Sequence, residues 1–425
     1  MSLPIELPTL QNWSCHNCGG CCRQHAIEIT AAEHQRIVEQ GWTGEAGFGP
    51  EQPLFTWSSG PPWKKRYRLA HREDGACVFL DERGLCRIHA RFGEAAKPLA
   101  CQVYPYALHP AGKRVTVSLR FSCPSVVANR GKPLTEKRSE LKEIERLVVP
   151  EGADRTPPPR ISHDQELAWP DFLRFIDALD ATLDQPGVPL VRKLLQALFW
   201  IRLVGQSRFE KIQGGRITEF LELVTGAAVA EIPESPEDIA AWGAPSPLAR
   251  SQFRLLVAQY ARKDTAVEVR QGWRGRLRLL KAALRFAKGQ GTIPRLQEQF
   301  AEIPFAAIET PFGPWPAEVE EILTRYFRVK VQGLHFCGRA YYDIPLVEGF
   351  QSLALMLPAT FWIARWLAAG EGRSSLSTED VSRALAIADH HHGYSPIFGQ
   401  WSFRRRVRTL ASTGDLEKLC AWYAR

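Results

Sequence analysis

The sequence of 425 residues has little that resembles an export signal or a membrane-spanning segment. Its opening residues, MSLPIELPTL, contain no basic segment followed by an apolar run, so we expect no secretory signal. The most apolar stretch, residues 352–364, contains Pro358 and is shorter than the roughly 20 residues that a membrane-spanning helix requires. We therefore expect a buried helix there, and a cytoplasmic protein without a membrane span.

Several cofactor-binding and nucleic-acid-binding patterns are missing too. No glycine-rich loop follows a strand, which excludes the classical Rossmann methyltransferase pattern. The CxxxCxxC spacing of radical S-adenosylmethionine enzymes is absent, and no nucleic-acid-binding module is recognisable. Strand-like alternation is scarce, and neither internal repeats nor low-complexity tracts occur. The sequence therefore predicts a mainly helical globular protein.

Cysteine is abundant but unevenly placed. Of the 10 cysteines, only Cys337 and Cys420 lie beyond the segment from Cys15 to Cys123. Thiols stay reduced in the cytoplasm, so this cluster indicates metal binding or redox chemistry rather than disulfides. The net charge of +8 favours acidic partners or anionic substrates without identifying either.

The cysteine-rich region, residues 1–130, is predicted to be irregular, with little β structure. Ile27 and Ile29 alternate as in a short strand, and Thr30 with Glu33 forms a capping box that opens a helix ending at Gly41. A second strand is expected over residues 113–121. The apolar residues of this region are too few for a large hydrophobic core. A bound metal would therefore stabilise the region.

The rest of the chain is predicted to be helical. A charged helix over residues 136–147 and the proline-rich segment 150–163 form a linker, placed at residues 131–163. An all-α domain over residues 164–425 follows. Apolar residues recur there at helical spacing over residues 171–183, 190–206, 215–225, 247–262, 273–288, 317–331, 347–369, 378–389 and 403–411.

The cysteine spacing favours an iron–sulfur cluster. Cys15, Cys18 and Cys21 follow one another at CxxC spacing, so one tight loop can direct three sulfurs at one centre. The same spacing starts the cluster-binding run of bacterial ferredoxins, which a remote cysteine followed by proline completes; Cys123-Pro124 offers that dipeptide. Zinc sites more often show two separated CxxC pairs, but zinc stays an alternative.

The remaining cysteines of this region extend the set of candidate ligands. Cys77 and Cys86 flank a predicted turn, which is the layout of a hairpin that brings two sulfurs together. The metal-ligand candidates are Cys15, Cys18, Cys21, Cys22, Cys77, Cys86, Cys101 and Cys123. Any one of the last four, Cys77, Cys86, Cys101 and Cys123, could instead be buried as a small apolar residue.

These cysteines resemble a known family. Cys15, Cys18, Cys21 and Cys22 match the CxxCxxCC signature of zinc- or iron-chelating proteins. The family's later segments follow in order as CVFL at 77–80, CRIH at 86–89 and KPLACQVYP at 97–105, with Lys97 and Gln102 in place of the usual arginines. The long helical extension is similar to that of the flagellin lysine-N-methylase branch.

The resemblance implies a protein that binds a [4Fe–4S] cluster or zinc. It also implies an S-adenosylmethionine-dependent methyltransferase that acts on lysine side chains of a protein substrate. The alternative is a non-catalytic metal-binding protein with a structural or redox role. A methyltransferase needs aromatic or acidic groups for the sulfonium cation; we expect these groups to be Tyr341, Tyr342 and Asp343 beside His335. The same segment could be ordinary core.

Two further motifs have competing interpretations. Along residues 273–288, an apolar stripe of Trp273, Leu277, Leu280 and Leu284 is followed by a basic stripe, which indicates either an anion-binding face or a solvated face beside a core stripe. The DHHHGYSP segment, residues 389–396, suggests metal ligands, but consecutive helical residues point in different directions. Gly393 favours a helix C-terminus there.

Overall fold

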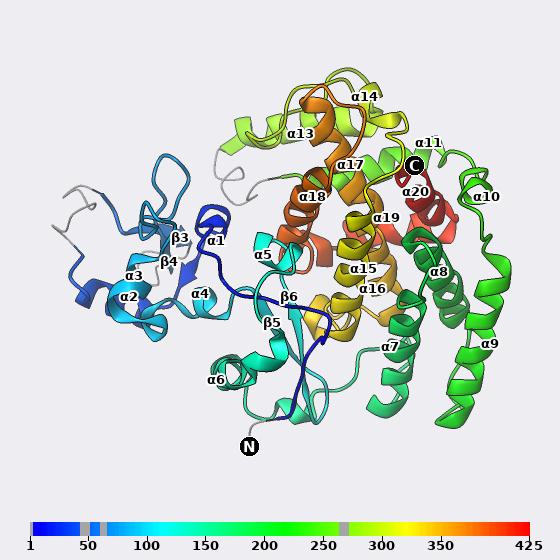
Figure 1. The fold of residues 1–425 in the computed structure, drawn as a ribbon, viewed down its shortest axis with the longest axis horizontal. Helices are drawn as coiled ribbons and strands as arrows, with labels where there is room; N and C mark the ends of the chain where they lie inside the picture. Colours follow the sequence, from blue (N-terminus) through cyan, green and yellow to red (C-terminus); the bar gives the residue numbers. More distant parts are fainter. Residues whose placement is uncertain (1–2, 43–51, 60–65, 263–271) are drawn as a thin grey trace.

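The computed structural model describes residues 3–42, 52–59, 66–262 and 272–425. The chain forms a small lobe, rich in cysteine, and a larger body made mostly of helices (Figure 1). The prediction of a mainly α protein is confirmed, since β structure in the described residues is confined to two sheets of three short strands each.

The small lobe is built around an antiparallel sheet in the order β2-β4-β3. Its strands are β2 (Glu28–Ile29), β4 (Arg66–Leu69) and β3 (Phe55–Ser59), and its helices are α1 (Gly20–Gln24), α2 (Ala31–Glu39), α3 (Arg87–Phe92) and α4 (Leu99–Val103), with the short 3-10 helix η1 (Glu94–Ala96). The predicted strand at residues 27–29 and the predicted capping box of α2 are both confirmed. Its buried apolar core is small, comprising Ile29, Ile37, Trp42, Leu69, Ala70, Cys77, Val78, Phe79 and Ile88.

The second sheet lies against the helical body. Its order is β1-β6-β5, with β1 (Ile5–Glu6) parallel and β5 (Tyr106–Pro110) antiparallel to β6 (Val115–Leu119). The side chains of β6 are fully buried on both faces, as expected of a strand covered by other elements. Helix α5 (Pro124–Val127), η2 (Leu134–Lys137), α6 (Arg138–Val148) and η3 (Ala153–Arg155) follow.

The helices of the larger body lie where the helical periodicity predicts them. They are α7 (Trp169–Leu183), α8 (Leu190–Gln206), α9 (Gly215–Glu231), α11 (Pro247–Tyr260), α13 (Gly272–Lys288), α15 (Ala317–Gln332), α16 (Leu346–Ala354), α17 (Met356–Gly370), α18 (Thr378–His391) and α19 (Trp401–Ser412). Four short 3-10 or α segments and one longer helix were not predicted: α10 (Pro236–Ala240), α14 (Ala306–Glu309), η4 (Arg339–Tyr341), η5 (Pro396–Gly399) and α20 (Asp415–Tyr423).

The helix predicted over residues 347–369 is divided into α16 and α17. Pro358 lies in the first turn of α17, where its missing N–H would have no partner within the helix. Together the two helices, Leu346–Gly370, have the length and hydropathy of a membrane span, but 89% of their most apolar window is buried inside the protein. This segment is therefore a core helix pair, as the sequence predicts.

Helix α15 joins the sheet to the helical body. It packs on β6 and α7, and the hydroxyl of Thr116 in β6 donates to the carbonyl of Gly333 at 3.2 Å. A Cβ at position 333 would lie 2.5 Å from the Cβ of Ser118, so this approach requires glycine. Strands β5 and β6 thus share the large core of the helical body, while the domain division at residue 130 stays a prediction.

Candidate metal centre

The loop that carries Cys15 and Cys18 rests on the turn between Cys77 and Cys86. Gly84 adopts a φ of 79° in that turn, and a Cβ there would lie 2.1 Å from the carbonyl oxygen of Asn17. Gly19 also has a positive φ, of 67°, and its α-carbon faces the side chain of Leu80. Since only glycine tolerates both the conformation and the close approach, these two positions fix the loop on the turn.

The predicted hairpin is present and places two cysteines beside the first helix. The carbonyl of Cys22 in α1 accepts a hydrogen bond from the N–H of Cys77 at 2.8 Å. Leu80 and Cys86 form an isolated antiparallel bridge, so the two ends of the hairpin meet. Cys86 then begins α3 as its N-cap residue. The chain thus brings Cys22, Cys77 and Cys86 together.

Five of the cysteine thiols influence one another electrostatically. The Sγ atoms of Cys21 and Cys22 are 3.9 Å apart. This contact, followed by burial and then the thiolates of Cys77 and Cys86, raises the pKa of Cys22. Burial, and after it the thiolates of Cys86 and Cys21, raises the pKa of Cys77 to about 12. Burial and the Cys77 and Cys86 thiolates likewise raise the pKa of Cys101 in α4.

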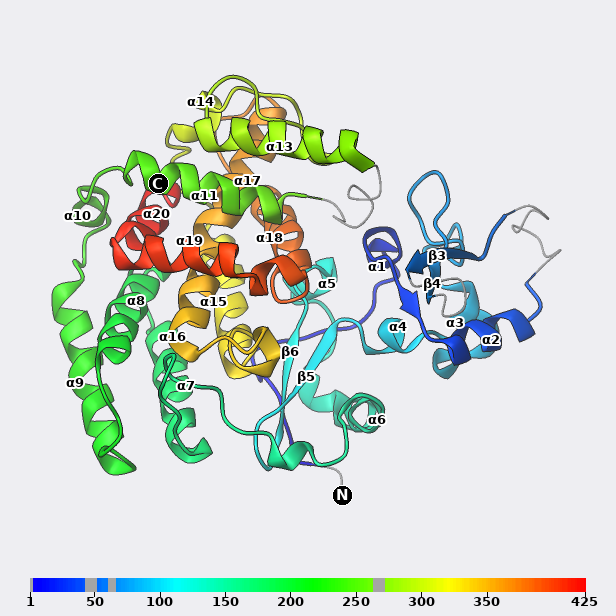
Figure 2. The same cartoon turned by 180° about the vertical axis from the view of Figure 1, so that it is seen from behind.

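Two further sulfurs lie at the junction of the lobe and the helical body. A Cβ at Gly20 would lie 3.5 Å from Cys18 Sγ and 3.7 Å from a side-chain carbon of Pro124. Pro124 begins α5 and directly follows Cys123. Figures 1 and 2 show α1 and α5 side by side in both views. Burial raises the pKa of Cys123, and the Cys18 thiolate contributes to the shift.

Tyr104 connects the two sulfur groups. Burial raises the pKa of its phenol, and the thiolates of Cys123 and Cys21 contribute in the same direction. Seven of the eight predicted ligands are therefore linked to one another or to Tyr104 by contacts or electrostatic interactions. The eighth, Cys15, is exposed, and its Sγ lies 3.6 Å from the side-chain oxygen of Asn17.

A cation stands beside the sulfurs. Lys97, which replaces a family arginine, binds Glu94 at 2.6 Å through its ammonium group. Burial alone would lower the pKa of Lys97. The hydrogen bond to Glu94 and the thiolates of Cys101 and Cys86 outweigh burial, so the pKa is raised. The side-chain amide of Gln102 donates to the Lys97 carbonyl at 2.7 Å, which holds this segment in place. The positive charge at position 97 is thus retained next to the thiols.

The donor set can be tested against each metal. Four thiolates around one zinc at 2.3 Å would have sulfurs roughly 3.8 Å apart, a spacing that the pair Cys21 and Cys22 meets. Over residues 3–42, 52–59, 66–262 and 272–425, however, no three His, Cys, Asp or Glu side chains are placed to hold one ion. In a [4Fe–4S] cluster each cysteine binds a different iron, so the sulfurs stand farther apart. Thiols are the side chains that bind such a cluster.

The residues predicted to bind S-adenosylmethionine are not gathered into an open site. His335 and Tyr341 are 1% and 0% exposed. The hydroxyl groups of Tyr341 and Tyr342 bind Ser352 Oγ at 2.7 Å and the Ser395 carbonyl at 2.6 Å, respectively. Asp343 is exposed at the surface. A cavity of about 630 Å³ lies elsewhere, between α7 and α9. Cofactor binding by this segment stays a prediction.

His335 belongs instead to a buried polar cluster that sequence reasoning missed. Lys330 of α15 lies 3.3 Å from His335 Nδ1 and pairs with Asp389 of α18 at 2.8 Å. Burial lowers the pKa of Lys330. Burial also holds the pKa of His335 well below its usual range. No sequence signal links Lys330 to Asp389, since each is an ordinary helical position.

The polar cluster reaches the cysteine lobe through His390, which follows Asp389 in the chain. The guanidinium of Arg120 donates to the carbonyl of His390 at 3.2 Å. The imidazole of His25, three residues after Cys22, stacks on that of His390 with 4.7 Å between the ring centroids. His25 also contacts Tyr104, with 4.9 Å between centroids. The segment 389–396 is therefore an internal contact, and Gly393, with a φ of 81°, follows the end of α18 as predicted.

Comparison with known proteins bears on the first quarter of the chain. Residues 14–124 match a family model described as "CxxCxxCC: putative zinc- or iron-chelating domain". No curated protein and no solved structure matches the chain. The likeness of the helical body to the flagellin lysine-N-methylase branch is thus unsupported by any homologue. Residues 14–124 are thus similar to the zinc- or iron-chelating domain that this family model describes.

Proposed function

We propose that the cysteine lobe binds one [4Fe–4S] cluster. The observation that carries this proposal is the grouping of the thiols of Cys21, Cys22, Cys77, Cys86 and Cys101. Thiolates select iron–sulfur clusters and zinc over harder metals. The spread of the sulfurs, with no three placed on one ion in the described part of the chain, favours the larger group.

The first role of the cluster would be to stabilise the fold of the lobe. The apolar core of the lobe is small, and ligands from α1, the hairpin and α4 would be held together by one metal centre. Lys97 lies next to these ligands, where its charge offsets the negative charge of the thiolates. When bound, the cluster would also supply a one-electron redox centre. The contact of His25 with His390 connects that lobe to the buried polar cluster.

Methyl transfer to protein lysines is the second candidate. It is favoured by one observation, namely that His335, expected at the cofactor site, lies in the polar cluster that reaches the cysteine lobe. The burial of Tyr341 weighs against it, because a bound cofactor would need space that side chains fill. Thermal stabilisation of the cluster-loaded protein by S-adenosylmethionine would support this candidate, and an unchanged melting temperature would leave the metal-binding role alone.

The metal-binding proposal is tested by purifying the chain without oxygen. A brown protein with equal amounts of iron and acid-labile sulfide supports a cluster. A colourless protein that contains zinc would refute the cluster and leave the chelating role. A Cys420→Ser variant is the matched control, since Cys420 is a buried thiol of the helical body remote from the lobe.

A further inference from the structure

Helix α13 has two apolar faces. Phe286 is fully buried and contacts Phe305 and Trp362. At 100° per residue, the stripe of Trp273, Leu277, Leu280 and Leu284 lies about 150° around the helix from Phe286. These four side chains are 71%, 42%, 57% and 54% exposed, so the interpretation of this stripe as core is wrong. The fold leaves a continuous row of large apolar side chains facing solvent.

The charged residues of α13 itself are all positive. The helix contains Arg274, Arg276, Arg278, Lys281, Arg285 and Lys288, and no aspartate or glutamate. By the same helical geometry, Lys281, Arg274 and Arg285 lie along one edge of the stripe, and Arg276 lies beyond the other edge. A row of tryptophan and leucine between cations is the arrangement of helices that lie in a membrane interface.

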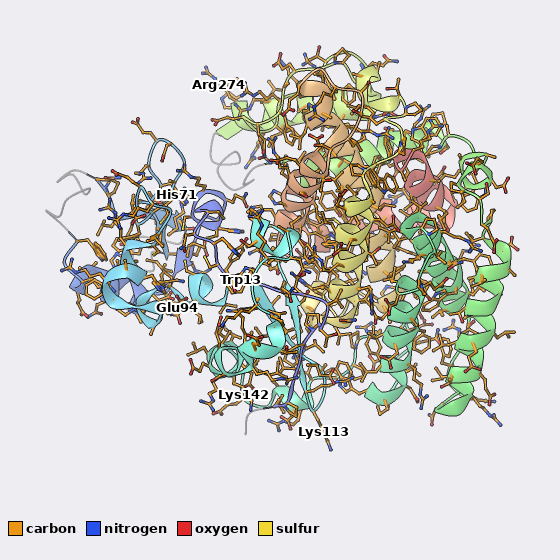
Figure 3. All side chains as sticks on the ribbon, viewed as in Figure 1. Trp13, His71, Glu94, Lys113, Lys142 and Arg274 are labelled. Carbon is orange, nitrogen blue, oxygen red and sulfur yellow. The ribbon has the colours of Figure 1, made fainter. Side chains whose placement is uncertain are left out.

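The position of α13 leaves this face accessible. Figures 1 and 2 show the helix along the outer edge of the helical body, on the side away from α7 and α9. Figure 3 shows the side chain of Arg274 pointing away from the molecule at that edge. Helix α13 is held from behind by α11, whose Arg254 donates to the carbonyl of Phe286 at 2.9 Å. The helix is thus presented on a rigid support.

We propose that α13 docks the protein on an anionic membrane surface, with Trp273 and the three leucines among the acyl chains. Anionic headgroups complement the six cations, and the apolar row gains burial. A second copy of the chain would bring like charges together. Nucleic acid would neutralise the cations but leave the apolar row in water.

The test is co-sedimentation of the full chain with vesicles. One set contains phosphatidylcholine alone, and the other contains equal parts of phosphatidylcholine and phosphatidylserine. We expect binding to the second set only, weakened by salt because the headgroup attraction is screened. Replacing Leu280 and Leu284 together by Gln should weaken binding about tenfold or more. Replacing Arg274, Lys281 and Arg285 by Gln should abolish the preference for phosphatidylserine.

The matched control is Leu223→Gln in α9, because Leu223 is 71% exposed and lies on another face. This variant should bind as the unchanged protein does. An unchanged melting temperature of each variant shows that the fold is intact. No sedimentation with phosphatidylserine vesicles, or equal sedimentation with both sets, would overturn the proposal. So would full binding by the double leucine variant, or capture of an acidic protein partner in place of vesicles.

Discussion

Lys330 and Asp389 form an ion pair in which both side chains are 0% exposed, with 2.8 Å between Nζ and Oδ1. Lys330 also donates to the carbonyl of Leu119 at the end of β6, and Asp389 accepts from the N–H of Ser122 at 3.1 Å. The pair therefore connects α15 and α18 to the end of β6 and to the segment that leads to Cys123. It joins the helical body to the segment from which the cysteine lobe departs.

Breaking this pair should be costly. Asp389→Leu leaves a buried ammonium without its partner, and we expect a loss of about 3–5 kcal/mol in the free energy of unfolding. Lys330→Met should cost a similar amount for the converse reason. The double variant should cost less than the sum, because neither charge remains; denaturant unfolding of all four proteins measures this difference. Strict additivity would show that the two charges act independently.

The capping box of α2 should stabilise the cysteine lobe locally. Thr30 Oγ1 accepts from the N–H of Glu33, whose carboxylate accepts from Thr30 N and from Leu99 N in α4, each at 2.7 Å. Thr30→Ala should cost about 1 kcal/mol in the protection of α2 amides from hydrogen exchange. Glu39→Gln, on an exposed carboxylate at the other end of the helix, is the control and should change little.

Glu33 also predicts a pH dependence. Burial opposes its ionisation, but hydrogen bonds from Leu99 and Thr30 lower its pKa from 4.5. Because its pKa is lowered, Glu33 contributes fully to the stability of the fold at pH values above 4.5. This contribution is lost as the pH falls through the folded-state pKa. The difference in α2 protection between the unchanged protein and Glu33→Gln should therefore be full at neutral pH and shrink in acid. A constant difference would contradict the role of the carboxylate.

Metal removal should release the small lobe and spare the helical body. The lobe depends on a small apolar core, whereas the helical body has a large continuous one. After chelation, limited proteolysis should cut first between Cys15 and Cys101, and a helical fragment should persist. Equal resistance of the lobe with and without metal would show that its own side chains suffice to hold it.

Local sequence patterns predicted most elements of this fold. The capping box of α2 and the periodicity of helices such as α8 act within one turn or one helix, so they are readable from the chain alone. Helix α13 shows the limit of such patterns. Its apolar stripe is indistinguishable in sequence from a core stripe, and only the surroundings of Phe286 decide which face is buried.

The cysteines could be predicted as a set, but their arrangement could not. The spacing of Cys15, Cys18 and Cys21 indicates a metal loop, whereas the structure places Cys21 with the hairpin and Cys18 beside Pro124. The polar cluster is even harder to predict from the sequence. Lys330 and Asp389 come from different helices, and their pairing follows from how α15 and α18 pack on β6.

The ligand assignment distinguishes Cys77 from Cys337. Both are buried thiols, with 7% and 1% exposure, but only Cys77 lies among other cysteines. Cys77→Ser should lose the metal, because one ligand of the group is removed from a lobe with little core. Cys337→Ser should retain it, since this residue lies in the helical body.

The most direct test is the iron, sulfide and zinc content of the unchanged protein and these two variants, all purified without oxygen. The account predicts about four irons and four sulfides per chain in the unchanged protein and in Cys337→Ser. It predicts neither in Cys77→Ser. Zinc in place of iron, or a full complement of iron and sulfide in Cys77→Ser, would contradict it.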